Sequence, residues 1–387
     1  MAVEFSRRLA KLPPYPFAEI NRKKKQAIAE GKDVISFGVG DPDQPTPGHI
    51  VKAAQAALEN PKYHHYPFDA GLSEFRKAVS QWYASRFNVT LDPDTQVRAC
   101  IGSKDGLSHA HFALLDPGDV ALMPDPGYPV YATSTIFAGG KPYALPLKEK
   151  NDFLPDLEAV PKAVLQKTKI LFLNSPGNPT SAVADGAFFE KAVRMAKKYN
   201  FVILHDAAYS EIYFENPPIS FLSVPGAADV GVEYHSLSKT YNMTGWRIGW
   251  YCGNASIVGV LGSTKENFDS GVFEAVQIAG VSALTSPQDC VRDMRKLYKE
   301  RRDLLCDGLK NLGWKFRLPE ASFYIWVQTP KGYTSNKTVE KLIDDASLMT
   351  IPGSALGKHG EGYIRFALTV PKERIQAALS RLAKIRW

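Results

Sequence analysis

The chain contains the stretch His235-Ser-Leu-Ser-Lys-Thr-Tyr-Asn-Met-Thr-Gly-Trp-Arg-Ile-Gly-Trp250, in which one lysine lies among several side chains that bind oxyanions. Lys239 sits between two hydroxyl residues, and Arg247 begins a strand-like segment eight positions later. Hydroxyl groups and an arginine fork suit a phosphate group. Most lysines are only surface charges, but a lysine beside a phosphate site suggests a phosphorylated aldehyde cofactor held as a Schiff base. Pyridoxal phosphate is the usual cofactor of this kind, and the hypothesis requires the other parts of its site elsewhere in the chain.

Length and composition are those of an ordinary globular protein, with 387 residues, 44% hydrophobic and 22% charged. The net charge of +7 is modest, and the basic run Arg22–Lys25 has no interleaved aromatic residues, so we expect no nucleic-acid partner. No apolar run approaches the ~20 residues of a membrane span, and the N-terminus has no apolar signal segment. The four cysteines show neither metal-ligand spacing nor a disulfide framework. We therefore expect a cytoplasmic protein with no membrane association and no metal site.

Apolar strands alternate with helices through the middle of the chain. The strands are expected at residues 97–102, 120–123, 141–145, 169–173, 201–205, 230–235 and 247–252. Helices are expected at 48–59 and 71–87 before this region, and at about 128–138, 157–165 and 185–199 within it. This alternation predicts an α/β domain with a mostly parallel sheet covered by helices on both faces. Ligands of such sheets bind in the loops beyond the carboxyl ends of the strands.

The two chain ends follow another pattern. Prolines hold the segment Leu12–Phe17 extended, and a helix at 17–30 and a strand at 34–37 follow it. After a long helix at about 286–312, short strands (323–327, 348–351, 363–366) alternate with helices (336–346, 372–385). We expect a smaller α+β domain here, with which the N-terminal segment packs. The predicted division is 1–45 (arm and part of the small domain), 46–285 (large domain) and 286–387 (linking helix and small domain).

Three polar residues beyond the expected strands offer contacts for the ring of the cofactor. Asp206 ends the apolar segment Phe201–Asp206, where a carboxylate either caps a helix or holds a pyridinium N–H and so keeps the ring an electron sink. Tyr209 and Asn178 offer hydrogen bonds to a phenolic oxygen, although the Pro/Gly/Asn cluster around Asn178 is also typical of an ordinary turn. Each signal is weak alone, and it is their combination that favours a cofactor site.

Two further loops supply a phosphate site and a stacking surface. Ser103 occupies the expected N-cap position of a helix, and the N-terminus behind Gly102-Ser103-Lys104 is a ready anion site. Tyr128 follows the strand at 120–123 and offers a flat ring for stacking. Together with Lys239, these loops contain every part that the cofactor hypothesis requires.

This set of motifs resembles the class I and II aminotransferases of the fold-type-I pyridoxal-phosphate family, over essentially the whole chain. The resemblance implies a large α/β domain, a small domain made of both chain ends, and an active site completed across a homodimer. It also implies that Lys239 forms the Schiff base, Asp206 pairs with the ring nitrogen, and Tyr128 stacks on the ring. Asn178 and Tyr209 are then the residues that bind the phenolic oxygen.

The same resemblance assigns the phosphate and the substrate. The phosphate is expected to be surrounded by Ser103, Lys104, Ser236, Ser238 and Arg247, and Tyr66 to reach it from the neighbouring subunit. Arg365 resembles the arginine that clamps the α-carboxylate of the substrate bidentately. The residues expected to face both cofactor and substrate are Lys104, Tyr128 and Asn178.

Within the family, four segments resemble the aminotransferases that act on LL-diaminopimelate: residues 12–20, 101–106, 124–131 and 363–371. Tyr15 and Gly40 match substrate-contacting positions of those enzymes, and Asp69 lies near the acid that meets the distal ammonium group. The segment Asn267–Glu274 departs from the better-known members, whose asparagine has no clear match here.

The resemblance implies transamination of LL-2,6-diaminopimelate with 2-oxoglutarate, which yields tetrahydrodipicolinate for lysine and peptidoglycan synthesis. The expected partners are amino-acid and 2-oxo-acid substrates and a second copy of the chain. Three alternatives stay open. An aspartate- or alanine-type aminotransferase of broader specificity shares every cofactor residue, and a C–S β-lyase shares the fold. A non-catalytic regulator of this fold usually carries a helix-turn-helix extension and tends to lose the lysine.

Overall fold

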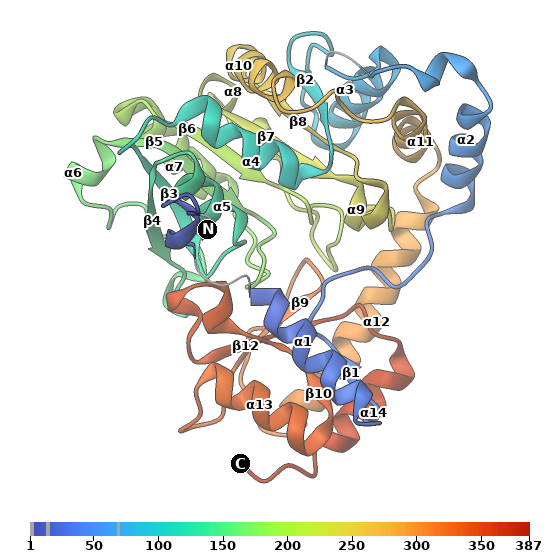
Figure 1. Cartoon of the computed structure of the whole chain (residues 1–387), viewed down its shortest axis with the longest axis vertical. Helices are drawn as coiled ribbons and strands as arrows, with labels where there is room; N and C mark the ends of the chain where they lie inside the picture. Colours follow the sequence, from blue (N-terminus) through green and yellow to red (C-terminus); the bar gives the residue numbers. More distant parts are fainter. Residues whose placement is uncertain (1–3, 13–15, 68–69) are drawn as a thin grey trace.

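The computed structural model of the chain describes residues 4–12, 16–67 and 70–387, with side chains in the second range from residue 22 onward. Figure 1 shows a larger half built on a seven-stranded sheet and a smaller half, below it in the view, that contains α1 (Pro16–Ala29) and the C-terminal elements. The long helix α12 (Asp289–Asn311) runs between them. Within the described residues, no helix combines the length and apolar character needed to cross a membrane.

The large sheet has the strand order β2-β8-β7-β6-β5-β3-β4. All neighbouring pairs from β7 to β4 are parallel, and β8 is antiparallel to both of its neighbours. The strand bounds are Val97–Cys100 (β2), Val120–Asp125 (β3), Lys141–Pro146 (β4), Thr168–Asn174 (β5), Val202–Asp206 (β6), Gly231–Ser236 (β7) and Gly249–Gly253 (β8). The predicted α/β fold with a mostly parallel sheet is therefore confirmed.

Successive side chains of each strand enter different cores, because they point to opposite faces of the sheet. In β6, Ile203 packs into one core and Leu204 into the other. The helices that contribute to the Ile203 core include Gly48–Leu58 (α2), Ser73–Phe87 (α3), Gly186–Tyr199 (α7) and Glu274–Thr285 (α11). Those of the Leu204 core are Ser103–Leu114 (α4), Val130–Phe137 (α5) and Ala255–Glu266 (α10). Side chains at neighbouring positions of one strand therefore belong to different sides of the sheet.

The small half joins the two ends of the chain. β1 (Ile35–Ser36) pairs in parallel with β10 (Leu348–Met349), and Ile35 and Phe37 share a core with C-terminal residues. A second small sheet is antiparallel, in the order β11 (Ile351–Pro352), β12 (Tyr363–Ala367) and β9 (Tyr324–Gln328). The helices here are Ser335–Ala346 (α13) and Lys372–Leu382 (α14), together with α1 and α12.

Three expectations about local structure were wrong. The helix expected at 157–165 is only Lys162–Leu165 (α6), because Pro161 disfavours helical backbone at the residue before it. The strand expected at 348–351 is split, since β10 pairs with β1 while β11 pairs with β12. Helices α10 and α11 were not predicted, and α11 packs against both α2 and α3, which hides the one-sided apolar pattern of a surface helix.

Candidate active site

A cavity of about 380 Å³ opens at the edge of the large sheet where the parallel strands end. Open α/β sheets bind ligands at this edge, and the volume lies in the range of small-molecule sites. The predicted residues that line the cavity are Gly40, Ser103, Lys104, Tyr128, Asn178, Asp206, Tyr209, Ser236, Ser238, Lys239, Arg247 and Arg365. The fold therefore brings residues from the loop after β1 to β12 together at one place.

Lys239 lies in the single helical turn Leu237–Thr240 (α9) directly after β7. The Ser236 side chain caps this turn by accepting a hydrogen bond from the Ser238 amide (3.2 Å). The Lys239 ammonium donates to the Gly40 carbonyl (2.8 Å), which comes from the loop after β1. Burial lowers the pKa of Lys239 to about 8, against the opposing charge of Asp41. A lysine of this kind releases its proton easily, as an amine nucleophile or base must.

Asp206 is a buried carboxylate at the carboxyl end of β6. Its Oδ2 accepts a hydrogen bond from the Tyr131 hydroxyl (2.8 Å), and its Oδ1 accepts the Ala208 amide (3.3 Å). Burial raises the pKa of Asp206, and the hydrogen bond from Tyr131 opposes that rise. A carboxylate in this state gains from a charged N–H donor in the cavity.

The opposite end of the cavity is built around the N-terminus of α4. Ser103 is the first residue of this helix and not its N-cap, which corrects the prediction: Gly102 holds the N-cap position with φ of +78°. A Cβ on Gly102 would lie 2.5 Å from Nη2 of Arg247, so the close approach requires glycine. Arg247 is oriented by hydrogen bonds to the carbonyls of Thr244 (2.8 Å) and Ile101 (3.3 Å). The exposed helix N–H groups and this guanidinium make the end suitable for an anion.

Arg365 is a buried guanidinium contributed by β12. It donates to Oδ1 of Asn178 (2.6 Å) and to the Gly38 carbonyl (2.7 Å), and it lies 4.2 Å from the ring centre of Tyr324. The Tyr324 hydroxyl is in turn 3.1 Å from the Tyr209 hydroxyl. These contacts fix the planar fork that a substrate carboxylate requires.

Sequence reasoning missed several residues of this site. Besides the predicted set, the cavity is lined by Val39, Asn174, Ala208, Thr244 and Tyr324. Asn174 and Thr244 lie inside motifs that the sequence analysis recognised, so their positions in those motifs could have placed them in the site. Tyr324 had none, because it belongs to an apolar strand and meets the cavity only through tertiary packing.

Three predicted residues remain to be placed. Tyr15 and Asp69 lie outside the described residues. Tyr66 is described and 70% exposed. The role predicted for it in a neighbouring subunit stays a prediction.

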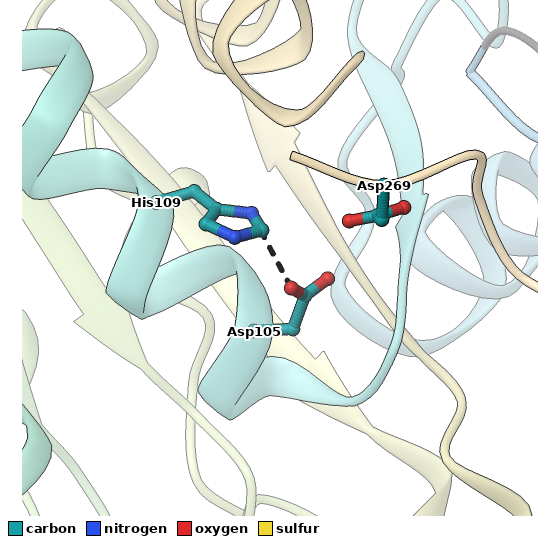
Figure 2. A group of neighbouring side chains, drawn as sticks. All are labelled: Asp105, His109 and Asp269. Atoms are coloured by element: carbon teal, nitrogen blue, oxygen red, sulfur yellow. Dashed lines mark ion pairs between the residues drawn. The ribbon is translucent and has the colours of Figure 1, made fainter. Parts of the chain in front are cut away.

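Asp105 and His109 of α4 form a separate cluster with Asp269, which lies in the loop after α10 (Figure 2). Lys265 places its ammonium 3.2 Å from Asp105 and 2.5 Å from Asp269, so a cation already balances the carboxylates. Asp105 also accepts the Ile101 amide (2.9 Å), which ties the turn before α4 to the helix. The cluster therefore stabilises the turn at the N-terminus of α4, which forms the anion end of the cavity.

Comparison with known proteins agrees with this geometry. The family model for aminotransferase class I and II matches residues 32–382. The chain belongs to this family. Aminotransferases of this class depend on pyridoxal phosphate, and so does this one.

The similarity extends over whole chains. An LL-diaminopimelate aminotransferase from Aquifex aeolicus is 52% identical over 99% of both chains, and one from Syntrophobacter fumaroxidans is 50% identical over 100% of both. The substrate-bound structure of BacF from Bacillus subtilis superposes with a TM-score of 0.96 at 36% identity, covering 100% of this chain and 99% of that one.

The cavity fits pyridoxal phosphate in three respects. Its anion end combines the α4 N-terminus with Arg247, and Gly102 leaves the room that this approach needs. At another point of the wall, Asp206 offers a buried carboxylate for a protonated ring nitrogen. The Lys239 amine, with its lowered pKa, lines the same cavity and is suited to an aldehyde.

Proposed function

We propose that this aminotransferase transfers an amino group from LL-2,6-diaminopimelate to 2-oxoglutarate. The keto product of that substrate cyclises to tetrahydrodipicolinate, and glutamate is the second product. One observation carries the proposal: a complete amine, carboxylate and anion-binding cavity lies in a chain that is about half identical, along its whole length, to enzymes of this name.

The residues that would hold the cofactor follow from the cavity. Ser103, Lys104, Ser236, Ser238 and Arg247 would bind its phosphate, and Asp206 its ring nitrogen. Tyr128 would stack on the ring, and Asn178 and Tyr209 would meet its phenolic oxygen. When bound, pyridoxal phosphate supplies an electron sink that weakens the Cα–H bond of an attached amino acid.

Lys239 would do the proton transfer. Its amine is buried and its pKa is lowered to about 8, so near neutral pH a useful fraction is free to accept the proton from the substrate Cα. The same group, once protonated, returns the proton later in the half-reaction. Asp206 would remain ionised throughout, because a protonated ring nitrogen opposite it offsets the effect of burial.

Arg365 would position the substrate. Its guanidinium is already oriented by Asn178, Gly38 and Tyr324, so little conformational freedom is lost when a carboxylate binds. We propose Tyr15, Gly40 and Asp69 as the residues nearest the rest of the substrate. Of these, Gly40 lines the cavity, and its Cα approaches the Tyr324 hydroxyl so closely that a Cβ would lie 2.1 Å from it.

The proposal includes a cytoplasmic homodimer. Tyr66 is a large, exposed aromatic residue on the loop before α3, as expected for a side chain that completes the site of a second copy. Sedimentation of the wild-type protein and of a Tyr66→Ala variant, with cofactor titration of both, tests this. A dimer in which the variant binds cofactor more weakly supports the shared site, and a monomeric, fully active enzyme contradicts it.

The substrate assignment is tested by following glutamate and the cyclised product. Purified enzyme with cofactor and 2-oxoglutarate is given LL-diaminopimelate, meso-diaminopimelate, L-aspartate or L-alanine. The proposal predicts rapid use of the LL isomer and slow use of the others. Equal use of both isomers, or faster use of aspartate, would contradict the substrate but leave the family unchanged.

A further inference from the structure

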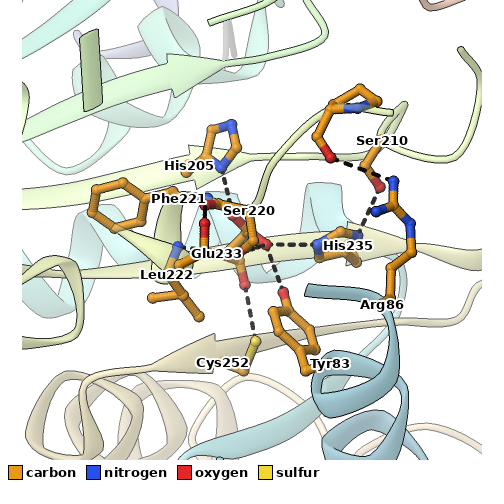
Figure 3. Close-up of polar contacts among 12 residues, drawn as sticks. Tyr83, Arg86, His205, Ser210, Ser220, Phe221, Leu222, Glu233, His235 and Cys252 are labelled. Atoms are coloured by element: carbon orange, nitrogen blue, oxygen red, sulfur yellow. Dashed lines mark hydrogen bonds and ion pairs between the residues drawn. The ribbon is translucent and has the colours of Figure 1, made fainter. Parts of the chain in front are cut away.

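A second buried polar group lies on the opposite side of the sheet from Asp206. Glu233 of β7 is completely buried and accepts five hydrogen bonds (Figure 3). Three reach Oε1 from Tyr83 (2.8 Å), Ser220 (2.9 Å) and His235 (2.9 Å), and two reach Oε2 from His205 (2.8 Å) and the Phe221 amide (2.8 Å). The Glu233 network is therefore anchored to α3, β6, β7 and the loop after β6.

The hydrogen bonds define the charge of this network. Burial alone would raise the pKa of Glu233, but hydrogen bonds from His205 and His235 hold it below its usual range. An ionised carboxylate only accepts hydrogen bonds, so Nδ1 of His205 must carry a proton. Nε2 of His205 faces the Ser175 carbonyl at 3.1 Å, which also only accepts, so Nε2 must carry one too. With both nitrogens donating, His205 is an imidazolium ion.

His235 differs from His205 in its second contact. Its Nε2 donates to Glu233, while its Nδ1 faces the Ser210 hydroxyl at 3.4 Å, which is able to donate. The contacts of His235 therefore do not require a second ring proton, and only the pair of Glu233 and His205 has to be charged. Buried charges of opposite sign in direct contact satisfy each other.

Each histidine, and the serine that it contacts, is next to a residue of the cavity in the sequence. His205 precedes Asp206, and His235 precedes Ser236. Ser175 follows Asn174, and Ser210 follows Tyr209. Neighbouring strand residues point to opposite faces of the sheet. The Glu233 network therefore contacts β6 and β7 on the face opposite to Asp206 and Ser236, at the strand ends that border the cavity.

The link through Ser175 extends to Asn178. Asn174 donates from its side chain to the Asp206 carbonyl (2.8 Å), and its Oδ1 accepts the Asn178 amide (2.7 Å). The Ser175 amide donates to the same Asp206 carbonyl (3.3 Å). The loop that carries Asn178 is thus bonded to β6 in two ways. Asn174 and the Ser175 amide bond to the Asp206 carbonyl, and His205 bonds to the Ser175 carbonyl on the opposite face of the sheet.

We propose that the His205 imidazolium, held by Glu233, is a positioning residue for the cofactor site: it fixes Asp206 and the Asn174–Asn178 loop from behind the sheet. This inference rests on the proposed cofactor site for its function, but the charge of His205 does not. Its test therefore separates a failure of the inference from a failure of the proposed function.

The charge is measured at neutral pH on wild-type protein with ¹⁵N-labelled histidine, in the absence of cofactor. The titratable groups around His205 are Glu233 and, beyond it, His235 and Tyr83, with Asp206 on the other face; Phe189 and Phe221 pack on its ring. We expect one of the eight histidines to show both ring nitrogens protonated, and its signal to disappear in a His205→Asn variant. A neutral His205 overturns the inference.

Two variants separate the contacts of His205, because an Asn amide extends about as far as Nδ1 and a Gln amide about as far as Nε2. His205→Asn keeps the Glu233 bond and loses the Ser175 bond, whereas His205→Gln does the reverse. We expect the Asn variant to bind pyridoxal phosphate roughly 10- to 100-fold more weakly, and the Gln variant to lose mainly thermal stability. Absorbance titration of the cofactor and thermal melts of the apoprotein give the two readouts.

Tyr83→Phe is the matched control. It removes another buried donor to Glu233, and among the described residues no hydrogen bond joins the Tyr83 hydroxyl to β5 or to the Asn174–Asn178 loop. Cofactor affinity should stay within about threefold of wild type, although stability falls by the cost of one lost hydrogen bond. Equal losses of affinity in all three variants, or no loss in the Asn variant, would show a merely structural network and overturn the positioning role.

Discussion

Asp206 and Glu233 are two buried carboxylates on neighbouring strands, facing opposite sides of one sheet, and they are treated in opposite ways. Among the described residues, Asp206 accepts two hydrogen bonds and its pKa is raised, whereas Glu233 accepts five and its pKa is lowered. An ionised carboxylate has about four lone-pair sites. Glu233 is therefore saturated by the protein, and Asp206 keeps capacity for a ligand. Hydrogen-bond saturation, and not burial, separates the structural carboxylate from the functional one.

The largest expected effect is at the amine that shares the cavity with Asp206. Lys239→Ala should reduce transamination by several orders of magnitude, because both the covalent attachment and the proton transfer depend on it. Circular dichroism should show an unchanged fold. Asp206, and not Glu233, is assigned to the active site because it shares a cavity with Lys239. Near-normal turnover in this variant would remove that reason.

Neutralising Asp206 should affect activity far more than stability. Asp206→Asn should lower kcat by roughly 10³-fold, because it removes the charge that stabilises the protonated ring. Its burial already disfavours the ionised form, so the free energy of unfolding of the apoprotein should change little or increase. A variant that retains activity but unfolds easily would mean that Asp206 is structural.

The corresponding change at Glu233 should affect stability more than activity. Glu233→Gln leaves His205 without its counter-charge and should cost about 3–5 kcal/mol of unfolding free energy, measured with urea on the apoprotein. Turnover under saturating cofactor should fall less than in Asp206→Asn. If the two variants lost activity and stability in the same proportion, the contrast between the carboxylates would not hold.

Lys239 adds a pH dependence to this comparison. Its pKa is lowered from 10.5 to about 8 in the folded protein, so the folded state binds its proton less tightly than the unfolded state. The charged amine therefore destabilises the apoprotein at pH 7, and this penalty is relieved as pH rises from about 8 to 10.5. Lys239→Met should exceed wild type in stability by roughly 3 kcal/mol at pH 7, and the gap should close by pH 10.5. A gap independent of pH would contradict the lowered pKa.

The smallest effect is expected at Tyr131, which donates to Asp206. Tyr131→Phe removes one hydrogen bond and leaves the ring in place, so cofactor affinity should fall about tenfold. The matched control is Tyr241→Phe, a buried tyrosine that does not line the described cavity and whose hydroxyl donates to Gln288 instead of Asp206. A shift in the pH dependence of the cofactor spectrum is expected only for Tyr131→Phe, and its absence would mean that Tyr131 does not influence the ring nitrogen.

The sequence predicted the parts of the site that lie on recognisable motifs. Lys239, Asp206 and Asn178 each end or follow an apolar strand of the large sheet, and a parallel sheet brings such positions to one edge. Arg365 lies inside β12 of the small half, and it was predicted from the family resemblance. Ser103 was placed in the correct loop but at the wrong helix position, because the left-handed Gly102 takes the N-cap.

Other features could not be predicted because they depend on distant packing. Tyr131 and Tyr324 meet Asp206 and Arg365 only in the folded chain, and nothing in the sequence around either tyrosine indicates its partner. The network of Glu233 has no signal in the sequence, since its five donors come from α3, β6, the loop after β6 and β7. The helix expected at 157–165 is longer than the observed α6, because Pro161 disfavours helical backbone at the residue before it.

The central claim is that pyridoxal phosphate is held covalently by Lys239 and by no other lysine. It is tested most directly by reducing the cofactor-loaded protein with borohydride, digesting it and identifying the labelled peptide by mass spectrometry. The account predicts a single label, on the peptide that contains residue 239, and a protein that is coloured before reduction. A colourless protein, or a label on a different lysine, would contradict it.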